Sequence, residues 1–301
     1  MSNAHAHGPH AHGRDAGRTR RLALTLVLVC AYTGAEVIGG LVSGSLALLA
    51  DAGHMFSDAA ALTLTLIAIR VAQRPPTDRQ TYGYQRAEIL AALVNGATLL
   101  AIAFLIVLEA IERLREPRDV QSTLMLTVAA GGLAVNLASL WLLRGHERDD
   151  LNLRGAWLHV LTDALGSVQA LVAGLLIRTL GWTWTDPLAS ILIALLIVFS
   201  AWSLVRKSVL VLMEAAPAGL DMDAVRATLA GVPGVAGVHD LHVWTIGSGL
   251  VALSAHLVVP EGDADGQVLA DARLRLRERF GIRHVTLQLD RNDACTGEVH
   301  R

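Results

Sequence analysis

The stretch LALLADAGHMFSDAAALTLTLIAIRVA, residues 46–72, decides the fold class of this chain. It is apolar over most of its length. As a helix rising about 1.5 Å per residue, it spans the roughly 30 Å of hydrocarbon in a bilayer. Three ionisable side chains interrupt its first half, namely Asp51, His54 and Asp58. Because a charged group at mid-bilayer costs about 2.5–3.5 kcal/mol on insertion scales, these residues are predicted to have a function.

Five further apolar stretches of membrane-spanning length flank this one. They cover approximately Leu22–Val42, Ala87–Ile111, Ser122–Leu143, Leu153–Leu180 and Pro187–Met213. The composition agrees, since 53% of the 301 residues are hydrophobic and 17% are charged, against about 25% charged in a soluble domain. The chain is therefore predicted to be an α-helical membrane protein with six transmembrane helices within residues 21–213.

The distribution of basic residues predicts the orientation. Thirteen lie in segments on one side of the predicted helices: Arg14, Arg18, Arg20, Arg21, Arg70, Arg74, Arg79, Arg86, Arg144, Arg148, Arg154, Arg206 and Lys207. Four lie on the other side: Arg113, Arg115, Arg118 and Arg178. The side richer in basic residues faces the cytoplasm. Both termini are therefore predicted to be cytoplasmic, with the chain in the inner (plasma) membrane of the cell.

After Met213 the sequence changes character, because charge returns and the segments shorten. We expect, in order, a helix with Asp221 as its N-cap, two strands joined by a Gly-Ser-Gly turn, a helix and a strand. Their ranges are Asp221–Ala230, Gly237–Ile246, Leu250–Val259, Asp265–Phe280 and His284–Asp290. Residues 214–301 are predicted to form a small cytoplasmic α+β domain. Since so short a domain buries little core, dimerisation would help to stabilise it.

The polar residues inside the membrane repeat one pattern. His54 and Asp58 stand four residues apart in the second predicted helix, and His159 and Asp163 stand four apart in the fifth. Residues with this spacing lie on one face of a helix, one turn from each other. Asp51, near the start of its helix, is expected to be a cap or a mouth residue. Glu36, one of the deepest other polar groups, is expected to form an interhelical hydrogen bond, line a vestibule or cap a helix.

Two interpretations of the His–Asp pairs compete. In one, each His hydrogen-bonds its own Asp and the pairs hold helices together. In the other, two imidazole nitrogens and two carboxylate oxygens surround one cation as a tetrahedral set that suits Zn²⁺. The repetition of the same pair on two helices favours the metal site.

An ordered set of motifs runs through nearly the whole chain after its first twenty residues. It consists of Glu36 with residues 44–58 (GSLALLADAGHMFSD), residues 82–88 (YGYQRAE), residues 159–163 (HVLTD), Asp186-Pro187 and residues 239–244 (HDLHVW). This set resembles the zinc-transporting branch of the cation diffusion facilitator family.

The resemblance implies a homodimer in the lipid membrane, with six helices per protomer and a ferredoxin-like cytoplasmic domain. It implies alternating access, in which Zn²⁺ leaves the cytoplasm in exchange for protons. The transport site falls on His54, Asp58, His159 and Asp163, and His at the first position is similar to the zinc type. Cd²⁺ and Co²⁺ stay open as further substrates, because their ligand preferences overlap with those of Zn²⁺. A regulatory use of Zn²⁺ also stays open.

In the cytoplasmic domain, the resemblance points to His239, His256 and Asp290 as ligands of a further metal. Gln288 stands where some relatives place His, so a two-metal cluster is not expected and a single site stays open. The ordinary interpretation of His242 and His284 is a hydrogen-bonded or surface histidine.

Two loop features also follow from the resemblance. Some relatives hold a metal with histidine between the second and third helices, but residues 77–84 (TDRQTYGY) contain no His, so that site is predicted to be absent. Arg86 and Glu214 are expected to form a charge contact at the junction between the membrane and cytoplasmic parts.

Residues 1–20 are predicted to be a disordered cytoplasmic tail, because their composition cannot form a core. The histidines of this tail are His5, His7, His10 and His12. Either the tail captures cytoplasmic zinc near the pore, or it is a dispensable solvated segment.

Other classes of function lack their motifs. No Gly-x-x-x-x-Gly-Lys-Ser/Thr sequence occurs, so ATP-driven pumping is not expected, and no His-Glu-x-x-His sequence occurs, so a membrane metalloprotease is not expected either. We predict neither an enzymatic activity nor a nucleic-acid partner. A passive metal channel and a metal sensor stay open as rivals to a transporter.

Overall fold

The computed structural model describes residues 11–143, 151–247, 249–260 and 265–291, with side chains described from residue 27 onward and, after the gap, from residue 157. The chain forms two compact units. One comprises residues 1–62 and 95–202, and the other comprises residues 63–94 and 203–301.

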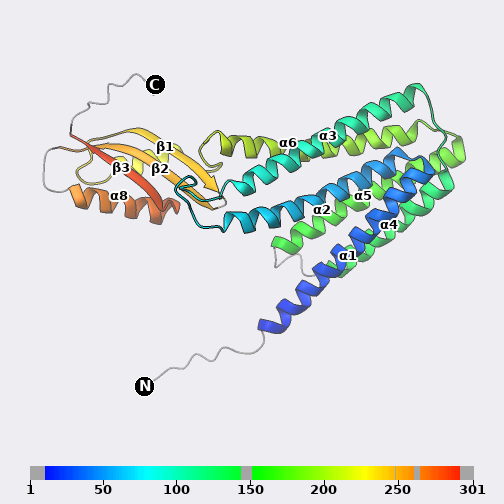
Figure 1. Cartoon of the computed structure of the whole chain (residues 1–301), viewed down its shortest axis with the longest axis horizontal. Coiled ribbons are helices and arrows are strands. Elements are labelled where there is room, and N and C mark those ends of the chain that lie inside the picture. Colours follow the sequence, from blue (N-terminus) through cyan, green and yellow to red (C-terminus); the bar gives the residue numbers. More distant parts are fainter. Residues whose placement is uncertain (1–10, 144–150, 248, 261–264, 292–301) are drawn as a thin grey trace. The chain divides into compact units, whose positions relative to one another are not determined.

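Six long helices precede the C-terminal sheet (Figure 1). They are α1 (Ala11–Ser43), α2 (Leu46–Ala72), α3 (Ala87–Arg115), α4 (Ser122–Leu143), α5 (Leu151–Leu180) and α6 (Thr185–Leu212). Helices α2 to α6 are long and apolar enough to cross a membrane, and the described side chains of α1 form a shorter apolar segment, Val27–Ser43. The predicted set of six membrane helices is therefore confirmed as six candidate spans.

The start of the first helix differs from the expectation. We expected α1 to begin near Leu22 after a disordered tail, but its backbone is helical from Ala11. The Arg, Ala and Leu residues of this segment favour a helix, and the apolar helix that follows provides a template for it. Of the tail histidines, His5, His7 and His10 lie outside the described residues, as does the side chain of His12.

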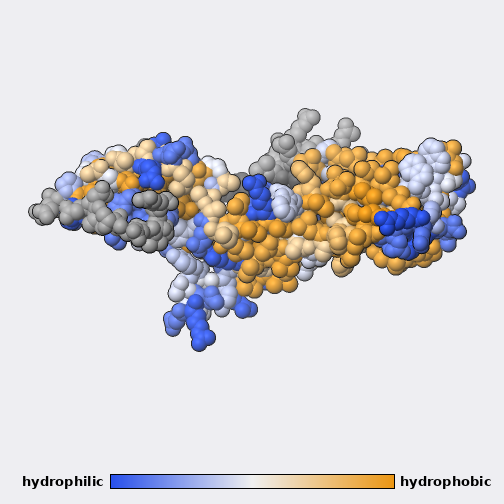
Figure 2. All heavy atoms as spheres, turned by 90° about the horizontal axis from the view of Figure 1, so that it is seen from above, coloured by the Kyte–Doolittle hydropathy of each residue, from blue (hydrophilic) through white to orange (hydrophobic). Residues whose placement is uncertain are grey.

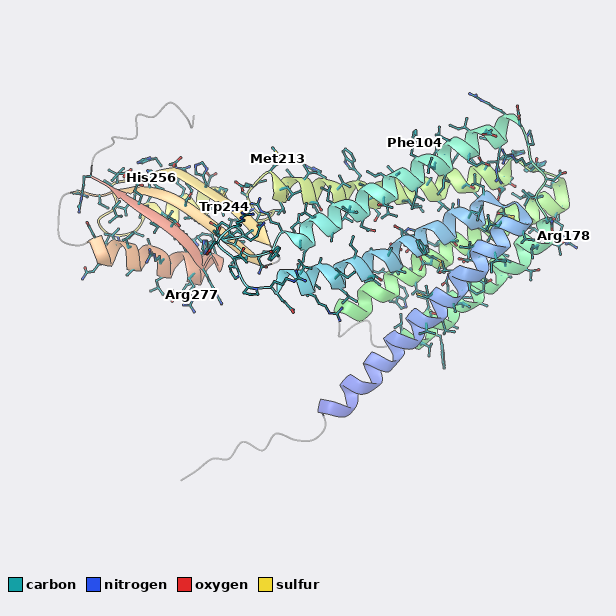
Figure 3. The ribbon with its side chains drawn as sticks, viewed as in Figure 1. Phe104, Arg178, Met213, Trp244, His256 and Arg277 are labelled. Carbon is teal, nitrogen blue, oxygen red and sulfur yellow. The ribbon has the colours of Figure 1, made fainter. Side chains whose placement is uncertain are left out.

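Large apolar side chains cover the outside of the helices, as Figure 2 shows in orange. Phe104 of α3, labelled in Figure 3, is 62% exposed, and Phe199 of α6 is 82% exposed. A soluble protein rarely exposes so much apolar surface. This surface therefore faces lipid.

Two apolar clusters meet on the first turns of α2. One joins Ala47 and Leu48 to α4 and α5, and the other joins Ala50 to α3 and α6. Alanine is frequent in both clusters, and small side chains allow membrane helices to approach closely. The half of α2 that leads to His54 is thus packed on both sides.

The start of α2 is capped from another helix. The Asp186 carboxylate of α6 is fully buried and accepts hydrogen bonds from the Ser45 hydroxyl at 2.6 Å and from the backbone N–H groups of Leu46 at 2.8 Å and Ala47 at 3.2 Å. These N–H groups are among those that a helix start leaves without an intrahelical partner. The expectation that Asp51 is a cap was therefore wrong, because Asp186 has that role.

The C-terminal part forms the predicted α+β domain from α7 (Met222–Ala230), β1 (Gly237–Gly247), β2 (Leu250–Val258), α8 (Asp265–Phe280) and β3 (His284–Asp290). The sheet order is β1-β2-β3; β1 pairs with β2 antiparallel, and β2 pairs with β3 parallel. Asp221 caps α7 as predicted. Alternate residues of β2, including Ala255 and Leu257, pack with α7 and α8 in the core. His256 between them consequently faces the other side of the sheet.

Candidate metal centres

The two membrane His–Asp pairs lie on facing helices. His54 and Asp58 are one turn apart on α2, and His159 and Asp163 are one turn apart on α5. His54 Nε2 lies 3.6 Å from Asp58 Oδ2, and His159 Nε2 lies 3.7 Å from Asp163 Oδ2. A third contact crosses between the helices, since His159 Nε2 also lies 3.6 Å from Asp58 Oδ2. The structure therefore brings the four predicted side chains into one group.

The polar atoms of this group do not satisfy one another. Separations of 3.6–3.7 Å are too long for hydrogen bonds. Among the described residues, His54 Nδ1, Asp58 Oδ2 and both Asp163 oxygens are buried without a hydrogen-bond partner. A tetrahedral Zn²⁺ with bonds near 2.0–2.1 Å places neighbouring ligand atoms about 3.3 Å apart. The three measured contacts lie close to that spacing, but the Nε2 atoms of His54 and His159 are more than 4.8 Å apart, so the side chains must move inward to surround such an ion.

Two further carboxylates are buried behind this group. Asp51 is 3% exposed, and its carboxylate packs against Gly166 of α5, where an added Cβ would lie 2.7 Å from Asp51 Oδ1. Glu36 is 1% exposed and packs against Gly132 in the same way. Glu36 Oε2 has no hydrogen-bond partner among the described residues. Glycines on α4 and α5 thus provide the space for both acids, and Asp51 is no mouth residue.

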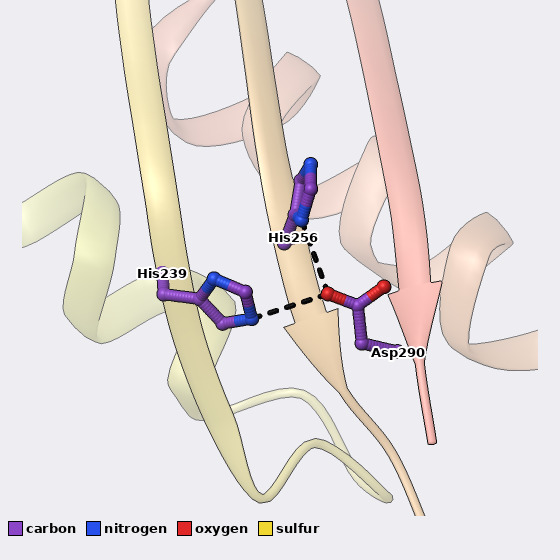
Figure 4. A group of neighbouring side chains, drawn as sticks. All are labelled: His239, His256 and Asp290. Atoms are coloured by element: carbon purple, nitrogen blue, oxygen red, sulfur yellow. Dashed lines mark hydrogen bonds and ion pairs between the residues drawn. The ribbon is translucent and has the colours of Figure 1, made fainter. Parts of the chain in front are cut away.

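A second group lies on the face of the C-terminal sheet that points away from α7 and α8 (Figure 4). His256 Nδ1 lies 3.0 Å and His239 Nε2 lies 3.2 Å from the same oxygen, Asp290 Oδ2. The strand register explains the convergence, because His239 is opposite His256 and Val258 is opposite Asp290. The ligand atoms of His239, His256 and Asp290 all lie within 4.8 Å of one another, close enough to hold one metal ion. Among the described residues, no other group of three or more His, Cys, Asp or Glu side chains meets this condition.

The sequence did not predict a fourth residue of this group, Asp240. Asp240 has a left-handed backbone, with φ 50°, at a register irregularity between His239 and His242 in β1. Its Oδ2 lies 3.6 Å from His256 Nε2, and its Oδ1 lies 2.8 Å from His242 Nε2. Regular alternation would direct Asp240 away from His239, but an irregularity of this kind redirects a side chain. Asp is also one of the residues that tolerate positive φ, which is the available sequence signal.

Neighbouring groups keep Asp290 ionised. The Gln288 amide donates to Asp290 Oδ1 at 2.9 Å, and this hydrogen bond, followed by the nearby His256 and His239, lowers the pKa of Asp290 below its ordinary value. A hydrogen bond to the charged form favours that form. Gln288 therefore supports the carboxylate at the position where some relatives were expected to have His.

The predicted contact at the membrane junction is present. Arg86 Nη2 donates to Glu214 Oε1 at 2.7 Å, and both side chains are partly exposed. His284 makes an edge contact with the Tyr82 ring, with centroids 5.6 Å apart. These contacts connect the loop between α2 and α3 to the C-terminal segment within one compact unit.

Both parts of the chain match one family. Residues 22–213 match the cation efflux transmembrane domain, and residues 217–292 match the cytoplasmic domain of cation efflux proteins. The chain belongs to the cation efflux family, the cation diffusion facilitators of the resemblance. It is therefore a multi-pass membrane protein of a family that transports metal ions.

Several relatives cover nearly the whole chain. The cadmium, cobalt and zinc/H⁺-K⁺ antiporter of Bacillus subtilis is 42% identical over 93% of this chain and 91% of its own length. The zinc transporter ZitB of Escherichia coli is 43% identical over 96% of this chain and 93% of its own length. The metal-bound C-terminal domain of the CzcD transporter from Cupriavidus metallidurans is 33% identical, covers 24% of this chain and 99% of its own, and has a TM-score of 0.23.

Proposed function

We propose that this chain exports Zn²⁺ from the cytoplasm in exchange for protons, with Cd²⁺ and Co²⁺ as further substrates. The transported ion binds to His54, Asp58, His159 and Asp163. The observation that carries this proposal is the group of buried carboxylate oxygens without partners between α2 and α5. Burying such oxygens is costly unless a cation or protons neutralise them.

The alternative, in which each pair serves only to hold helices together, has less support. A pair of that kind would form a hydrogen bond within 3.2 Å or so, whereas the contacts within the pairs measure 3.6 and 3.7 Å. The contact from His159 to Asp58 also connects the two pairs. A shared cation explains both features.

Proton exchange follows from the type of ligand. Imidazole must be neutral and carboxyl groups must be ionised to bind Zn²⁺, so metal and protons compete for the same atoms. When the site is open to the cytoplasm, these groups bind Zn²⁺. When it is open to the other side, protons displace the metal and return with the emptied site. Imidazole suits this exchange, because it gains or loses its proton near physiological pH.

The named relatives support the choice of ions. The Bacillus subtilis protein is named for cadmium, cobalt, zinc and protons, and the Escherichia coli protein is named for zinc. Each is more than 40% identical to this chain over more than nine-tenths of its length. A passive channel remains the nearest rival, since it would use similar ligands without exchanging protons.

Transport into proteoliposomes tests the exchange. Zinc uptake by the full chain is expected to rise with an outward-directed proton gradient and to fall when an ionophore removes that gradient. Uptake that is independent of the gradient would establish the passive channel instead.

A matched pair of variants tests the site. Asp163→Ala is expected to abolish uptake, whereas Asp78→Ala, at an exposed loop position, is expected to retain it. If Asp163→Ala transports zinc while remaining folded, the ligand set is wrong.

We also propose that both termini are cytoplasmic and that the chain lies in the plasma membrane as a homodimer. Residues 21–213 form the transport domain, and residues 214–301 form a dimerisation and metal-sensing domain in which His239, His256 and Asp290 bind regulatory Zn²⁺. The compact arrangement of these three ligand atoms supports that role. Zinc titration of the full chain, with and without His256→Ala, tests it; equal stoichiometries would contradict it.

A further inference from the structure

A hollow of about 680 Å³ opens on the cytoplasmic domain, and none of its lining residues belongs to either metal group. The C-terminal half of α8 and the start of β3 line it. Arg273, Arg277 and Arg283 contribute guanidinium groups, and Leu274 and Ile282 contribute apolar surface. Arg277 lies on α8, which packs on one face of the sheet, and His256 lies on the other face (Figure 3).

Across the residues that the structure describes, the three guanidinium groups of the hollow lack the polar partners that Arg275 and Arg279 of α8 have. Arg275 pairs with Asp271 at 3.0 Å, and Arg279 donates to the Thr228 hydroxyl at 3.1 Å. Within the described ranges, the guanidinium groups that line the hollow have no hydrogen-bond or ion-pair partner. Three positive charges around one concavity repel each other, so an anion bound between them would relieve that repulsion.

The hollow lies next to the ends of two membrane helices. His284, which also lines it, contacts Tyr82 in the loop between α2 and α3. From the same loop, the Gln85 amide donates to the Ala72 carbonyl at the end of α2. The backbone of Gly247, at the end of β1, packs directly on Gln85. This edge of the domain therefore lies at the level where α2 leaves the membrane and α3 enters it.

The chemistry of the lining indicates which anion fits. A guanidinium binds phosphate oxygens through two parallel hydrogen bonds. The headgroup layer extends about 5–7 Å beyond the hydrocarbon on each side of a bilayer, which brings lipid phosphates to the helix ends. Leu274 is 51% exposed beside the arginines, and a lipid can cover such a side chain, whereas a free phosphate ion leaves it in water.

We propose that this hollow binds the phosphate headgroup of an anionic phospholipid from the cytoplasmic leaflet. The cytoplasmic leaflet carries negative lipids that attract arginines near its surface. Such a lipid would connect the cytoplasmic domain to the membrane beside the loop that joins α2 and α3. The proposal does not depend on which metal the chain transports.

Lipid binding by the full chain tests this proposal through two matched variants. The protein, stripped of lipid in neutral detergent, is titrated with fluorescent phosphatidylglycerol. R273Q/R277Q is expected to weaken binding about tenfold or more. R275Q/R279Q removes two charges from the same helix at the same spacing and is expected to bind as the unaltered chain does. Equal weakening in both variants would overturn the site, because net charge would then suffice.

Two further arms identify the source of the phosphate. Phosphatidylcholine is expected to bind weakly to every variant, and millimolar inorganic phosphate is expected to leave phosphatidylglycerol bound. Displacement by inorganic phosphate would overturn the lipid assignment in favour of a soluble anion. If R273Q/R277Q proves unstable by thermal unfolding, Arg283→Gln supplies the test, since it lies outside α8. Unchanged binding by a folded Arg283→Gln would also overturn the proposal.

Discussion

The two candidate metal groups of this chain differ in how their polar atoms are partnered. In the membrane, three His–Asp contacts measure 3.6–3.7 Å, and the Asp163 side chain is fully buried with both oxygens unpartnered among the described residues. On the cytoplasmic sheet, His256 and Asp290 lie 3.0 Å apart, Gln288 supports the carboxylate, and His239 is 26% exposed.

This difference fits two different tasks. Buried groups that lack partners gain most from an incoming cation, and they also accept protons when the cation leaves. The groups on the sheet already contact one another within 3.2 Å. We therefore propose that the membrane group transports the ion and that the cytoplasmic group binds it stably.

The largest effect is expected from Asp58→Asn. Asp58 Oδ2 contacts both histidines, so the amide would remove the charge that they share. Loss of a residue that only supports a metal ligand costs up to about a hundredfold, so loss of this ligand is expected to cost at least about that much in transport. Zinc uptake into proteoliposomes measures it, with Asp78→Asn as the control. Transport near the unaltered level would remove Asp58 from the ligand set.

Gly166→Ala tests the packing behind the membrane group. The new Cβ would lie 2.7 Å from Asp51 Oδ1, so α5 or the carboxylate must move. Overpacking of this kind costs about 1–3 kcal/mol, visible as a lower unfolding temperature in detergent and as reduced transport. Gly34→Ala is the control, because its Cβ would meet nothing within 4 Å. Equal stability of the two variants would contradict the close packing of Asp51.

His256→Ala tests the role of the cytoplasmic group. Loss of this ligand is expected to weaken zinc binding by the cytoplasmic group at least about tenfold, while uptake through the membrane group continues. Equilibrium dialysis counts the bound zinc, and vesicle uptake follows transport. Abolished uptake in a folded variant would mean that the two groups are not separate in function.

The smallest effect is expected at the junction. The side chains of Arg86 and Glu214 are 40% and 59% exposed, and exposed pairs contribute about 0.2–1 kcal/mol. Arg86→Gln should therefore lower the unfolding temperature slightly, and the double variant R86E/E214R should recover part of that loss. A loss of several kcal/mol would mean that the pair has a larger role than its exposure indicates.

Long-range patterns in the sequence predicted much of this structure. Both ends of α2 and of α4 were predicted correctly. Gly44-Ser45 and Pro75-Pro76 bracket the apolar run of α2, and polar residues bracket that of α4. The spacing of the His–Asp pairs predicted which residues share a helix face. The two faces meet because α2 and α5 pack against each other, and a periodic pattern in the sequence does not predict which helices pack together.

Individual polar contacts were harder to predict. Asp186 caps a helix that begins 140 residues earlier in the chain, so sequence proximity wrongly favoured Asp51 as the cap. Asp240 joins the cytoplasmic group through a strand irregularity with a left-handed residue. Regular alternation along β1 hides such a feature. In both cases the deciding interaction joins segments that are remote in sequence.

The central claim is that one transported Zn²⁺ binds between α2 and α5. Anomalous scattering at the zinc absorption edge, from crystals of the full chain grown with zinc, tests it most directly. We expect a peak about 2.0–2.2 Å from ligand atoms of His54, Asp58, His159 and Asp163, and no such peak in Asp163→Ala. No peak among these four side chains at saturating zinc, or an unchanged peak in that variant, would contradict the account.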